Sequence, residues 1–208
     1  MTVTQDPAEA AMALEAGRAV VLPTPTPLPY VVAASTPAVV NEAKGRPAGQ
    51  PTGLVVSGFD VVAPFLALDD AAAALARRAT DEFLLNLFVP VTDGAPGWLR
   101  PAEASGLVGV TTAYLPFVRP LLGPHGVLPV SSGNRSGGAV AVTAAQADAE
   151  FGGQLTVLDG DHARDPTVPC GSAAIVVVHP GGRLELARGG VQTDGSDPEA
   201  YLAAVAGL

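Results

Sequence analysis

Two short segments of this 208-residue chain carry residue types that could hold an anion. The first is Lys44-Gly45-Arg46-Pro47, where two cations flank a glycine ahead of a proline. The second is 131–138 (SSGNRSGG), which is rich in hydroxyls and glycine. The backbone N–H groups and hydroxyls of such a loop can converge on a phosphate, while lysine supplies a point charge and arginine a bidentate fork. Both segments therefore suit an anion site; the alternative reading is an exposed turn and an ordinary loop.

Neither segment belongs to the common nucleotide-binding motifs. The patterns G-x-G-x-x-G and G-x-x-x-x-G-K-[ST] are both absent from the sequence. Lys44 is also the only lysine, beside ten arginines. A compact ammonium and a planar guanidinium are not interchangeable. The single lysine therefore suggests a position where arginine does not suffice, and the alternative is a surface lysine placed by chance.

The elements that must position these residues interleave irregularly. Apolar residues at helical spacing and capping residues predict helices at 7–16, 37–43, 69–80, 143–150 and 198–206. Short apolar runs predict strands at 19–22, 53–56, 84–89, 107–112, 128–131, 155–158, 174–178 and 184–187. This order fits a mixed α/β sheet better than a strict βαβ winding.

A proline-rich loop follows the first predicted strand. Prolines alternate with other residues through the segment 23–29 and exclude a regular helix there. Thr24 and Thr26 are therefore expected in a stiff, extended loop. Loops at strand ends are where α/β sheets bind their ligands. Both threonines are candidates for substrate contacts.

Composition predicts a single domain over residues 1–208, with a helical tail at about 197–208. No apolar run reaches the roughly 20 residues of a membrane span, and the N-terminus carries Asp6 and Glu9 where a secretory signal would be basic and then apolar. We therefore expect a cytoplasmic protein without membrane contact. The net charge of -9 makes direct RNA binding through a broad basic face unlikely on electrostatic grounds. With one cysteine and three scattered histidines, no metal site is predicted.

At the two anion-binding segments the sequence resembles the YrdC-like family, the threonylcarbamoyl-AMP synthases of tRNA modification. That family pairs a K-x-R motif with a distant S-x-N motif, matched here by Lys44/Arg46 and Ser132/Asn134. The resemblance runs from about residue 7 to 191. It includes the P-T-x-T loop at 23–26, a Val-Gly-Val strand at 108–110, Leu-Asp-Gly at 158–160 and Arg188-Gly189 after the last strand.

The resemblance implies a twisted mixed sheet with helices on its faces and a central nucleotide-binding cavity. It also implies an enzyme that joins L-threonine, bicarbonate and ATP, with Mg²⁺, into threonylcarbamoyl-AMP and pyrophosphate. By the same resemblance Lys44 and Arg46 are catalytic and hold the triphosphate or the carboxylate of the carbamate. The remaining implied contacts are Ser132 and Asn134 on phosphate oxygens, Arg188 on the adenylate, and Thr24 and Thr26 on the amino-acid substrate.

The sequence departs from the family pattern at several implied ligand contacts. The first loop lacks the acidic residue, the tyrosine and the glycine of PT-acidic-T-V-Y-G-L, and Thr111 stands where an arginine is usual. The P-G-P-x-T segment is absent near 82–86, and Ser-Thr-ϕ-Val-Asp reads Ala-Ala-Ile-Val-Val at 173–177. Two alternatives therefore stay open: a divergent paralogue that binds a nucleotide with another amine or no carbamoyl substrate, and an RNA-binding or ribosome-associated module.

Overall fold

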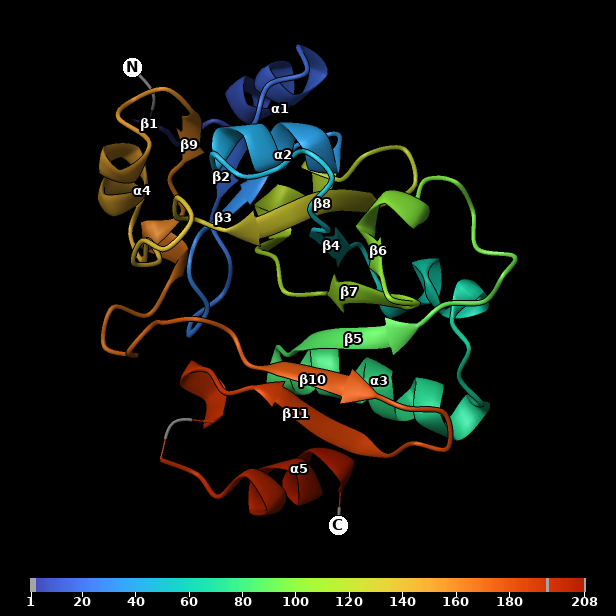
Figure 1. Cartoon of the computed structure of the whole chain (residues 1–208). Coiled ribbons are helices and arrows are strands. Elements are labelled where there is room, and N and C mark those ends of the chain that lie inside the picture. The colour runs from blue at the N-terminus through green and yellow to red at the C-terminus, as the bar shows by residue number, and fades with distance from the viewer. Residues whose placement is uncertain (1–2, 194, 208) are drawn as a thin grey trace.

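The strands of the computed structural model join into one twisted, mixed sheet (Figure 1). The structure describes residues 3–193 and 195–207. The strands are β1 (Val3–Thr4), β2 (Val20–Leu22), β3 (Val31–Ala33), β4 (Gly53–Val56), β5 (Asn86–Pro90), β6 (Glu103–Ala104), β7 (Leu107–Thr111), β8 (Val127–Ser132), β9 (Thr156–Leu158), β10 (Ile175–Val178) and β11 (Leu184–Arg188). Their order is β1-β9-β2-β3-β8-β4-β7-β5-β10-β11, with β6 beside β7.

The sheet is mixed because its neighbouring pairs differ in direction. β9 runs parallel to β1 and β2, β4 parallel to β7, and β5 parallel to β10. β8 lies at the middle and is antiparallel to both β3 and β4. The predicted α/β fold with a twisted mixed sheet is thus confirmed. The predicted extent of 1–208 and its tail at about 197–208 include residues 1–2, 194 and 208, which lie outside the described residues.

Capping side chains set where the helices begin. The α-helices of the described ranges are α1 (Pro7–Glu15), α2 (Pro37–Ala43), α3 (Asp70–Phe83), α4 (Ala144–Glu150) and α5 (Pro198–Ala206). The carboxylate of Asp69 accepts the backbone N–H of Ala72 at 2.9 Å, as an N-cap does. At the other end of α3, Leu84 adopts a left-handed conformation with φ 52°. The chain therefore leaves the helix there, and β5 begins at Asn86 instead of the predicted residue 84.

Short 3-10 turns complete the described elements. They lie at Phe59–Val61, Ala63–Phe65, Arg100–Ala102, Pro116–Leu121, Asp161–Ala163 and Val191–Thr193. No helix among residues 3–193 and 195–207 is both long and apolar enough to cross a bilayer.

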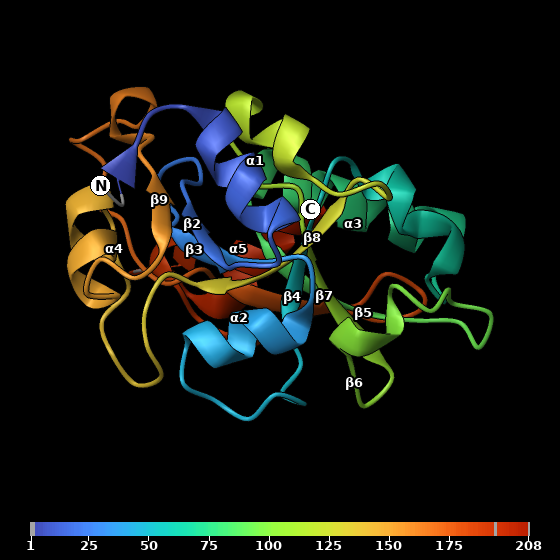
Figure 2. The same cartoon turned by 90° about the horizontal axis from the view of Figure 1, so that it is seen from above.

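Helices cover both faces of the sheet around β2 and β3. Figure 2 shows α1 and α2 on opposite sides of these strands. Along β2 the side chains alternate accordingly: Val20 and Leu22 pack in the cluster with α1, and Val21 packs in the cluster with α2 and α4. β2 and β3 are thus covered on both faces, which explains why these two strands are apolar throughout.

The other half of the sheet has helices on one face only. There α3 and α5 pack on β5, β10 and β11. Alternate residues of the strands fill that core, among them Leu54, Leu87, Val108 and Val176. The residues between them, among them Phe88, Gly109 and Ile175, point to the opposite face and line a cavity. That face forms the floor of the cavity described below.

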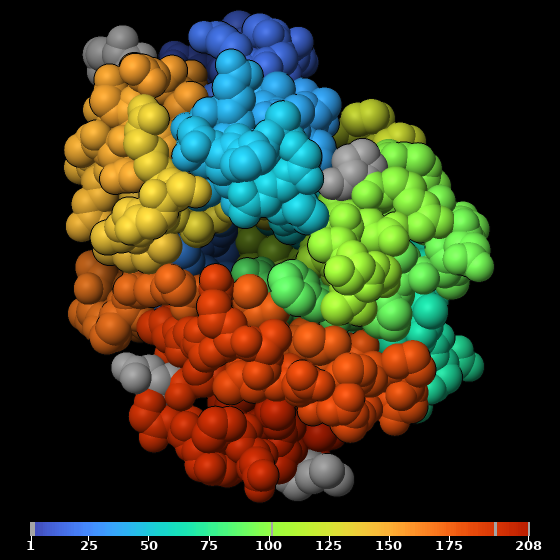
Figure 3. All heavy atoms as spheres, in the orientation of Figure 1, coloured from blue at the N-terminus to red at the C-terminus, as the bar shows by residue number. Residues whose placement is uncertain are grey.

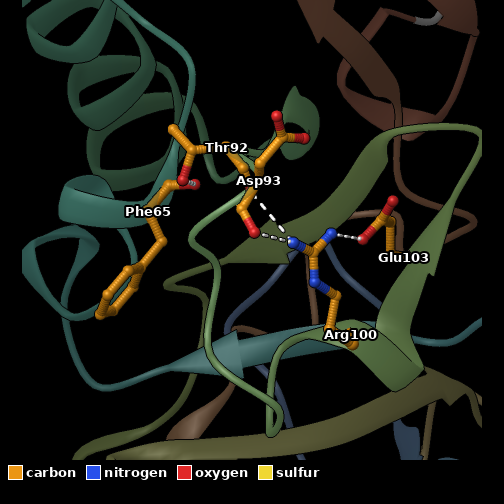
Figure 4. A network of polar contacts seen from close by, with 5 residues as sticks. All are labelled: Phe65, Thr92, Asp93, Arg100 and Glu103. Atoms are coloured by element: carbon orange, nitrogen blue, oxygen red, sulfur yellow. Dashed lines mark hydrogen bonds and ion pairs between the residues drawn. The ribbon is translucent and has the colours of Figure 1, made fainter.

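Arg100 holds the long connection between β5 and β7 together through hydrogen bonds. The Arg100 guanidinium donates to the carbonyl oxygens of Thr92 and Asp93 at 3.2 and 2.6 Å and to the Glu103 carboxylate at 2.6 Å (Figure 4). The ion pair is partly exposed, so by itself it contributes no more than about 1 kcal/mol. Its role is to order the connection beside the cavity-bearing half of the sheet.

Candidate functional site

A cavity of about 380 Å³ lies over the face of the sheet that the helices leave free. Its walls are the proline-rich loop, the segment between α2 and β4, the end of β8 and the strands β10 and β11. Figure 3 shows the hollow between the segment that follows α2 and the region of β10 and β11. The volume falls within the usual range of small-molecule sites, about 300–1,000 Å³.

Paired glycines make room for this cavity. Gly53 of β4 and Gly109 of β7 are partners in the parallel register, and both line the cavity floor. A Cβ on Gly109 would lie 3.1 Å from the Phe88 ring and 3.4 Å from the Gly53 Cα. Strand positions normally favour bulky side chains, so a glycine pair in two buried strands indicates that space is needed there.

Arg46 and Thr52 each present a polar group that the protein leaves unpaired. The Arg46 Nε donates to the Oδ1 of Asn41, but one of its terminal nitrogens is buried without a hydrogen-bond partner. The Thr52 hydroxyl has no partner either, although the residue is only 5% exposed. Buried polar groups in proteins are almost always hydrogen-bonded. Both residues line the cavity, so two unpaired donors are buried in its wall, and acceptor oxygens are the partners that these donors lack.

Lys44 takes a different position from Arg46. It is 4% exposed, and it is not among the residues that line the cavity. Its ammonium donates to the backbone carbonyl oxygens of Ser132 and Asn134. The pKa of Lys44 is lowered to about 8, chiefly by burial and also by the Arg46 charge, while the Glu150 carboxylate opposes the shift. Burial also lowers the pKa of Arg46 from its ordinary value.

The loop of the S-x-N motif is ordered by its own asparagine. The Asn134 amide donates to the carbonyl oxygens of Arg135 and Gly138, each at 2.8 Å. Asn134 is 8% exposed and lies behind the cavity wall, whereas Ser132 is half-buried and lines the cavity. The motif thus divides into a residue that shapes the loop and a residue that faces the cavity.

The proline-rich loop brings Thr24 to the cavity and leaves Thr26 away from it. Thr24 is buried, lines the cavity and donates its hydroxyl to the carbonyl oxygen of Pro29 at 2.6 Å. Thr26 is half-buried, does not line the cavity, and forms a cis peptide bond with Pro27. Only one of the two predicted substrate contacts therefore lies in the cavity wall.

A buried arginine that the sequence did not single out holds this loop. The Arg164 guanidinium donates to the carbonyl oxygens of Thr24 and Leu28 at 3.1 and 2.7 Å and lies over the Tyr30 ring at 5.0 Å. It is 8% exposed. No sequence motif marks it, because its partners are backbone carbonyls that come together only in the fold.

Arg188 reaches the cavity from the end of β11. Its guanidinium donates to the carbonyl oxygen of Ala173 at 2.9 Å, and the residue is exposed at the cavity rim. Thr111 also lines the cavity, but its hydroxyl accepts the backbone N–H of Ala113 at 3.2 Å. Among the predicted residues, the cavity therefore brings together Thr24, Arg46, Ser132 and Arg188. Wall residues that the sequence did not single out include Thr52, Gly53 and Asn86.

The cavity is locally cationic in an acidic chain. Its described lining residues include Arg46 and Arg188 and no aspartate or glutamate, although the net charge of the chain is -9. Within the described ranges no group of three His, Cys, Asp or Glu residues could hold a metal. The described lining therefore does not fit a protein-held Mg²⁺ ion, whose ligands would include carboxylates. The cavity fits an anion.

Solved structures share this fold at low sequence identity. A double variant of P. abyssi Sua5 has a TM-score of 0.66 and 18% identity over 91% of this chain and 59% of its own. P. abyssi Sua5 complexed with L-threonine has a TM-score of 0.61 and 19% identity over 81% of this chain and 49% of its own. E. coli YciO has a TM-score of 0.65 and 15% identity over 93% and 91%. The chain therefore spans only 49–59% of the two Sua5 chains.

A comparison with family models gives a match over most of the sequence. The Sua5/YciO/YrdC model, described as telomere recombination, matches residues 12–190. No curated protein sequence matches the chain significantly. The matched range extends from α1 to the residues that follow β11 and includes every wall of the cavity. The chain belongs to the Sua5/YciO/YrdC family.

Proposed function

We propose that the cavity binds the phosphate groups of ATP and that the protein is a nucleotidyltransferase resembling threonylcarbamoyl-AMP synthase. One observation carries the proposal: the unpaired nitrogen of Arg46 and the unpaired hydroxyl of Thr52 are buried in the wall of one cavity. Ser132 adds a hydroxyl to this wall and Arg188 a second guanidinium. Family membership supports an enzyme of this type, since Sua5 itself has been solved with L-threonine.

The chemistry of this class needs charge neutralisation more than a protein nucleophile. An amine and bicarbonate give a carbamate and water. An oxygen of the carbamate then attacks the α-phosphorus of ATP while the bond from that phosphorus to the leaving pyrophosphate breaks. In our proposal Arg46 donates to phosphate oxygens and offsets the charge that develops on them. Thr52 and Ser132 donate hydroxyl hydrogen bonds to the same group, and Arg188 approaches it from the rim. Positioning of the two anions in a partly desolvated cavity then lowers the barrier.

Magnesium enters this proposal only with the nucleotide. Because the described lining offers no carboxylate, an ion that accompanies ATP would be coordinated by phosphate oxygens and water. No step is assigned to it. The role of the protein is to hold the phosphates and to limit the access of water to them.

A second candidate is nucleotide binding with another amine, or without carbamoyl transfer. The observation that favours it is Thr111, which lines the cavity where the related synthases carry an arginine. Its hydroxyl is already engaged by the N–H of Ala113, so it does not replace a cation. The cavity wall at Thr111 therefore differs more from the family pattern than the wall formed by Arg46 and Ser132.

Calorimetric titration with ATP, AMP and pyrophosphate tests the nucleotide site. Arg46→Gln should weaken ATP binding by about 10- to 100-fold, because a hydrogen bond to a charged group contributes roughly 1.5–3 kcal/mol. Arg77→Gln is the matched control, since Arg77 pairs with Asp60 on the surface. Equal ATP affinity in the wild-type protein and in Arg46→Gln would contradict the site. Release of pyrophosphate from ATP that requires an amine and bicarbonate is expected of the enzyme, and binding without release would favour the second candidate.

A further inference from the structure

The two cations of the Lys44-Gly45-Arg46 turn are used differently. Gly45 has a φ of +66°, in the left-handed region that glycine adopts most readily. The side chains on either side of it diverge: Arg46 lines the cavity with an unpaired nitrogen, and Lys44 is buried behind the wall. A ligand in the cavity therefore meets the guanidinium and not the ammonium.

We propose that Lys44 is a positioning residue, whose ammonium joins the turn after α2 to the Ser132–Asn134 loop and so sets Arg46 and Ser132 at the right separation across the phosphate site. This role replaces the direct phosphate contact that the family resemblance implies for Lys44. The inference rests on the proposed function, because it concerns the wall of the same site.

Hydrogen-bond geometry is the first support. The Lys44 ammonium donates to the carbonyl oxygens of Ser132 and Asn134, two residues apart in one loop. In return the backbone N–H of Ser136 donates to the Lys44 carbonyl oxygen at 3.4 Å. The turn and the loop are thus joined in both directions. A compact ammonium with three donors can serve carbonyls that converge on one point, whereas a planar guanidinium spreads its donors apart.

The charges around Lys44 are the second support. Arg46 repels the ammonium, and Glu150 of α4 is the carboxylate that attracts it. Glu150 also accepts the backbone N–H of Arg135 at 2.6 Å, within the same loop. The carbonyl oxygens and Glu150 thus compensate part of the buried charge without a ligand. Arg46, by contrast, keeps an unpaired nitrogen that a ligand would satisfy.

The single lysine allows a direct test on the wild-type protein. Reductive methylation followed by peptide mapping reads Lys44 separately from the N-terminal amine, because no other lysine competes. We expect Lys44 to resist methylation in the native, ligand-free protein and to react only after unfolding. Addition of pyrophosphate should not change the extent to which Lys44 is methylated. Rapid methylation that pyrophosphate blocks would overturn the proposal and make Lys44 a ligand contact.

Variants separate positioning from binding. Lys44→Met should speed amide hydrogen exchange in the segment 131–138 of the ligand-free protein and should weaken pyrophosphate binding at least about tenfold. Arg46→Gln should weaken binding by a similar factor and leave exchange in that segment unchanged. Lys44→Arg keeps the positive charge but not the compact shape of the ammonium. We therefore expect faster exchange in the segment 131–138 and weaker pyrophosphate binding in this variant too. Unchanged exchange in Lys44→Met, or full affinity in Lys44→Arg, would refute the positioning role.

The two proposals fail in distinguishable ways. If the wild-type protein binds neither ATP nor pyrophosphate, the proposed function is wrong, while the exchange comparison still decides whether Lys44 orders the loop. If Lys44→Met does not fold, as circular dichroism would reveal, the methylation of wild-type Lys44 decides the question by itself.

Discussion

The backbone N–H of Gly133 donates to the carbonyl oxygen of Tyr30 at 2.7 Å, and a Cβ on Gly133 would lie equally close, 2.7 Å from that oxygen. The loop of the S-x-N motif therefore packs directly on the end of the proline-rich loop, and only glycine fits between Ser132 and Asn134. Two walls of the cavity are fixed to each other at this contact.

Gly133→Ala should accordingly displace the loop and weaken both stability and binding. Overpacking of this kind typically costs about 1–3 kcal/mol in unfolding free energy, and Ser132 would move with the backbone. Urea denaturation and ATP calorimetry measure the two effects. Gly49→Ala is the control, since a Cβ there meets nothing within 4 Å. Wild-type affinity in Gly133→Ala would contradict the close-contact argument.

Thr52→Val should separate binding from stability. The buried Thr52 hydroxyl has no partner in the protein, and leaving such a group unpaired costs roughly 1–3 kcal/mol. The isosteric valine removes this cost, so unfolding free energy should stay equal or rise. ATP affinity should fall about 2- to 10-fold, because one hydrogen bond to the ligand is lost. A variant that is less stable and binds ATP normally would show that Thr52 serves the fold instead.

Gly53→Val should fill the cavity from its floor. A Cβ at this position meets only ordinary contacts, the nearest being the Val130 carbonyl oxygen at 3.7 Å. A β-branched residue also suits a strand better than glycine does. We expect melting temperature to be kept while ATP binding is largely lost. A crystal structure of the variant with ATP still bound in the cavity would disprove this assignment of the floor.

Stability and binding should respond to pH in opposite directions around Lys44. Its pKa is about 8 in the folded protein, below the ordinary value of 10.5, chiefly because of burial. Between these values the unfolded chain binds the proton and the folded one does not, so the contribution of Lys44 to stability rises with pH. Anion affinity should fall over the same range as the nearby charge is lost. Melting curves and pyrophosphate calorimetry from pH 7 to about 10 check this, and the difference between wild type and Lys44→Met isolates the residue.

Threonylcarbamoyl-AMP formation should be slow with threonine. Thr111 stands in place of the family arginine, and its hydroxyl accepts a backbone N–H. Among the described lining residues, the remaining arginines are Arg46 and Arg188, which come from other walls of the cavity. Radiolabelled bicarbonate, ATP and threonine, compared with a panel of other amines, measure the rate and the preference. A rate equal to that of a synthase with the complete motif set would show that Arg46, Ser132 and Arg188 suffice.

Local signals explain how far the fold could be predicted. The helices carry capping residues such as Asp69 and Thr143, whose side chains accept N–H groups as expected, so their starts were found closely. β3 was missed because its three residues follow the proline-rich loop without a turn signal of their own. The two-residue strand β1 exists only through pairing with a distant partner, in which Val3 lies beside Val157 of β9. β6 forms a short hairpin with β7, in which Glu103 lies beside Val108, and it is too short to show an alternating pattern. Pairing of this kind leaves no periodic pattern in the sequence.

The site was predictable where a motif existed and not elsewhere. Arg46 and Ser132 were found through K-x-R and S-x-N, but the motifs do not say that Lys44 faces carbonyl oxygens while Arg46 faces the cavity. That difference follows from the left-handed turn at Gly45, which only the folded backbone fixes. Thr52 stands alone between a proline and a glycine, and its significance comes from burial without a partner.

The residues that form the cavity walls are synthesised at different times, because they come from opposite ends of the chain. Thr24 comes from the first sixth of the chain, whereas Ile175 and Arg188 belong to the strands that are synthesised last. A nascent chain therefore carries Thr24 and Arg46 well before the wall formed by β10 and β11 exists. Any ligand that contacts both sides binds only after β10 has docked on β5, and by mass action it then favours that docked state. If the ligand is the nucleotide that we propose, its binding would favour the state in which the last strands have joined the sheet.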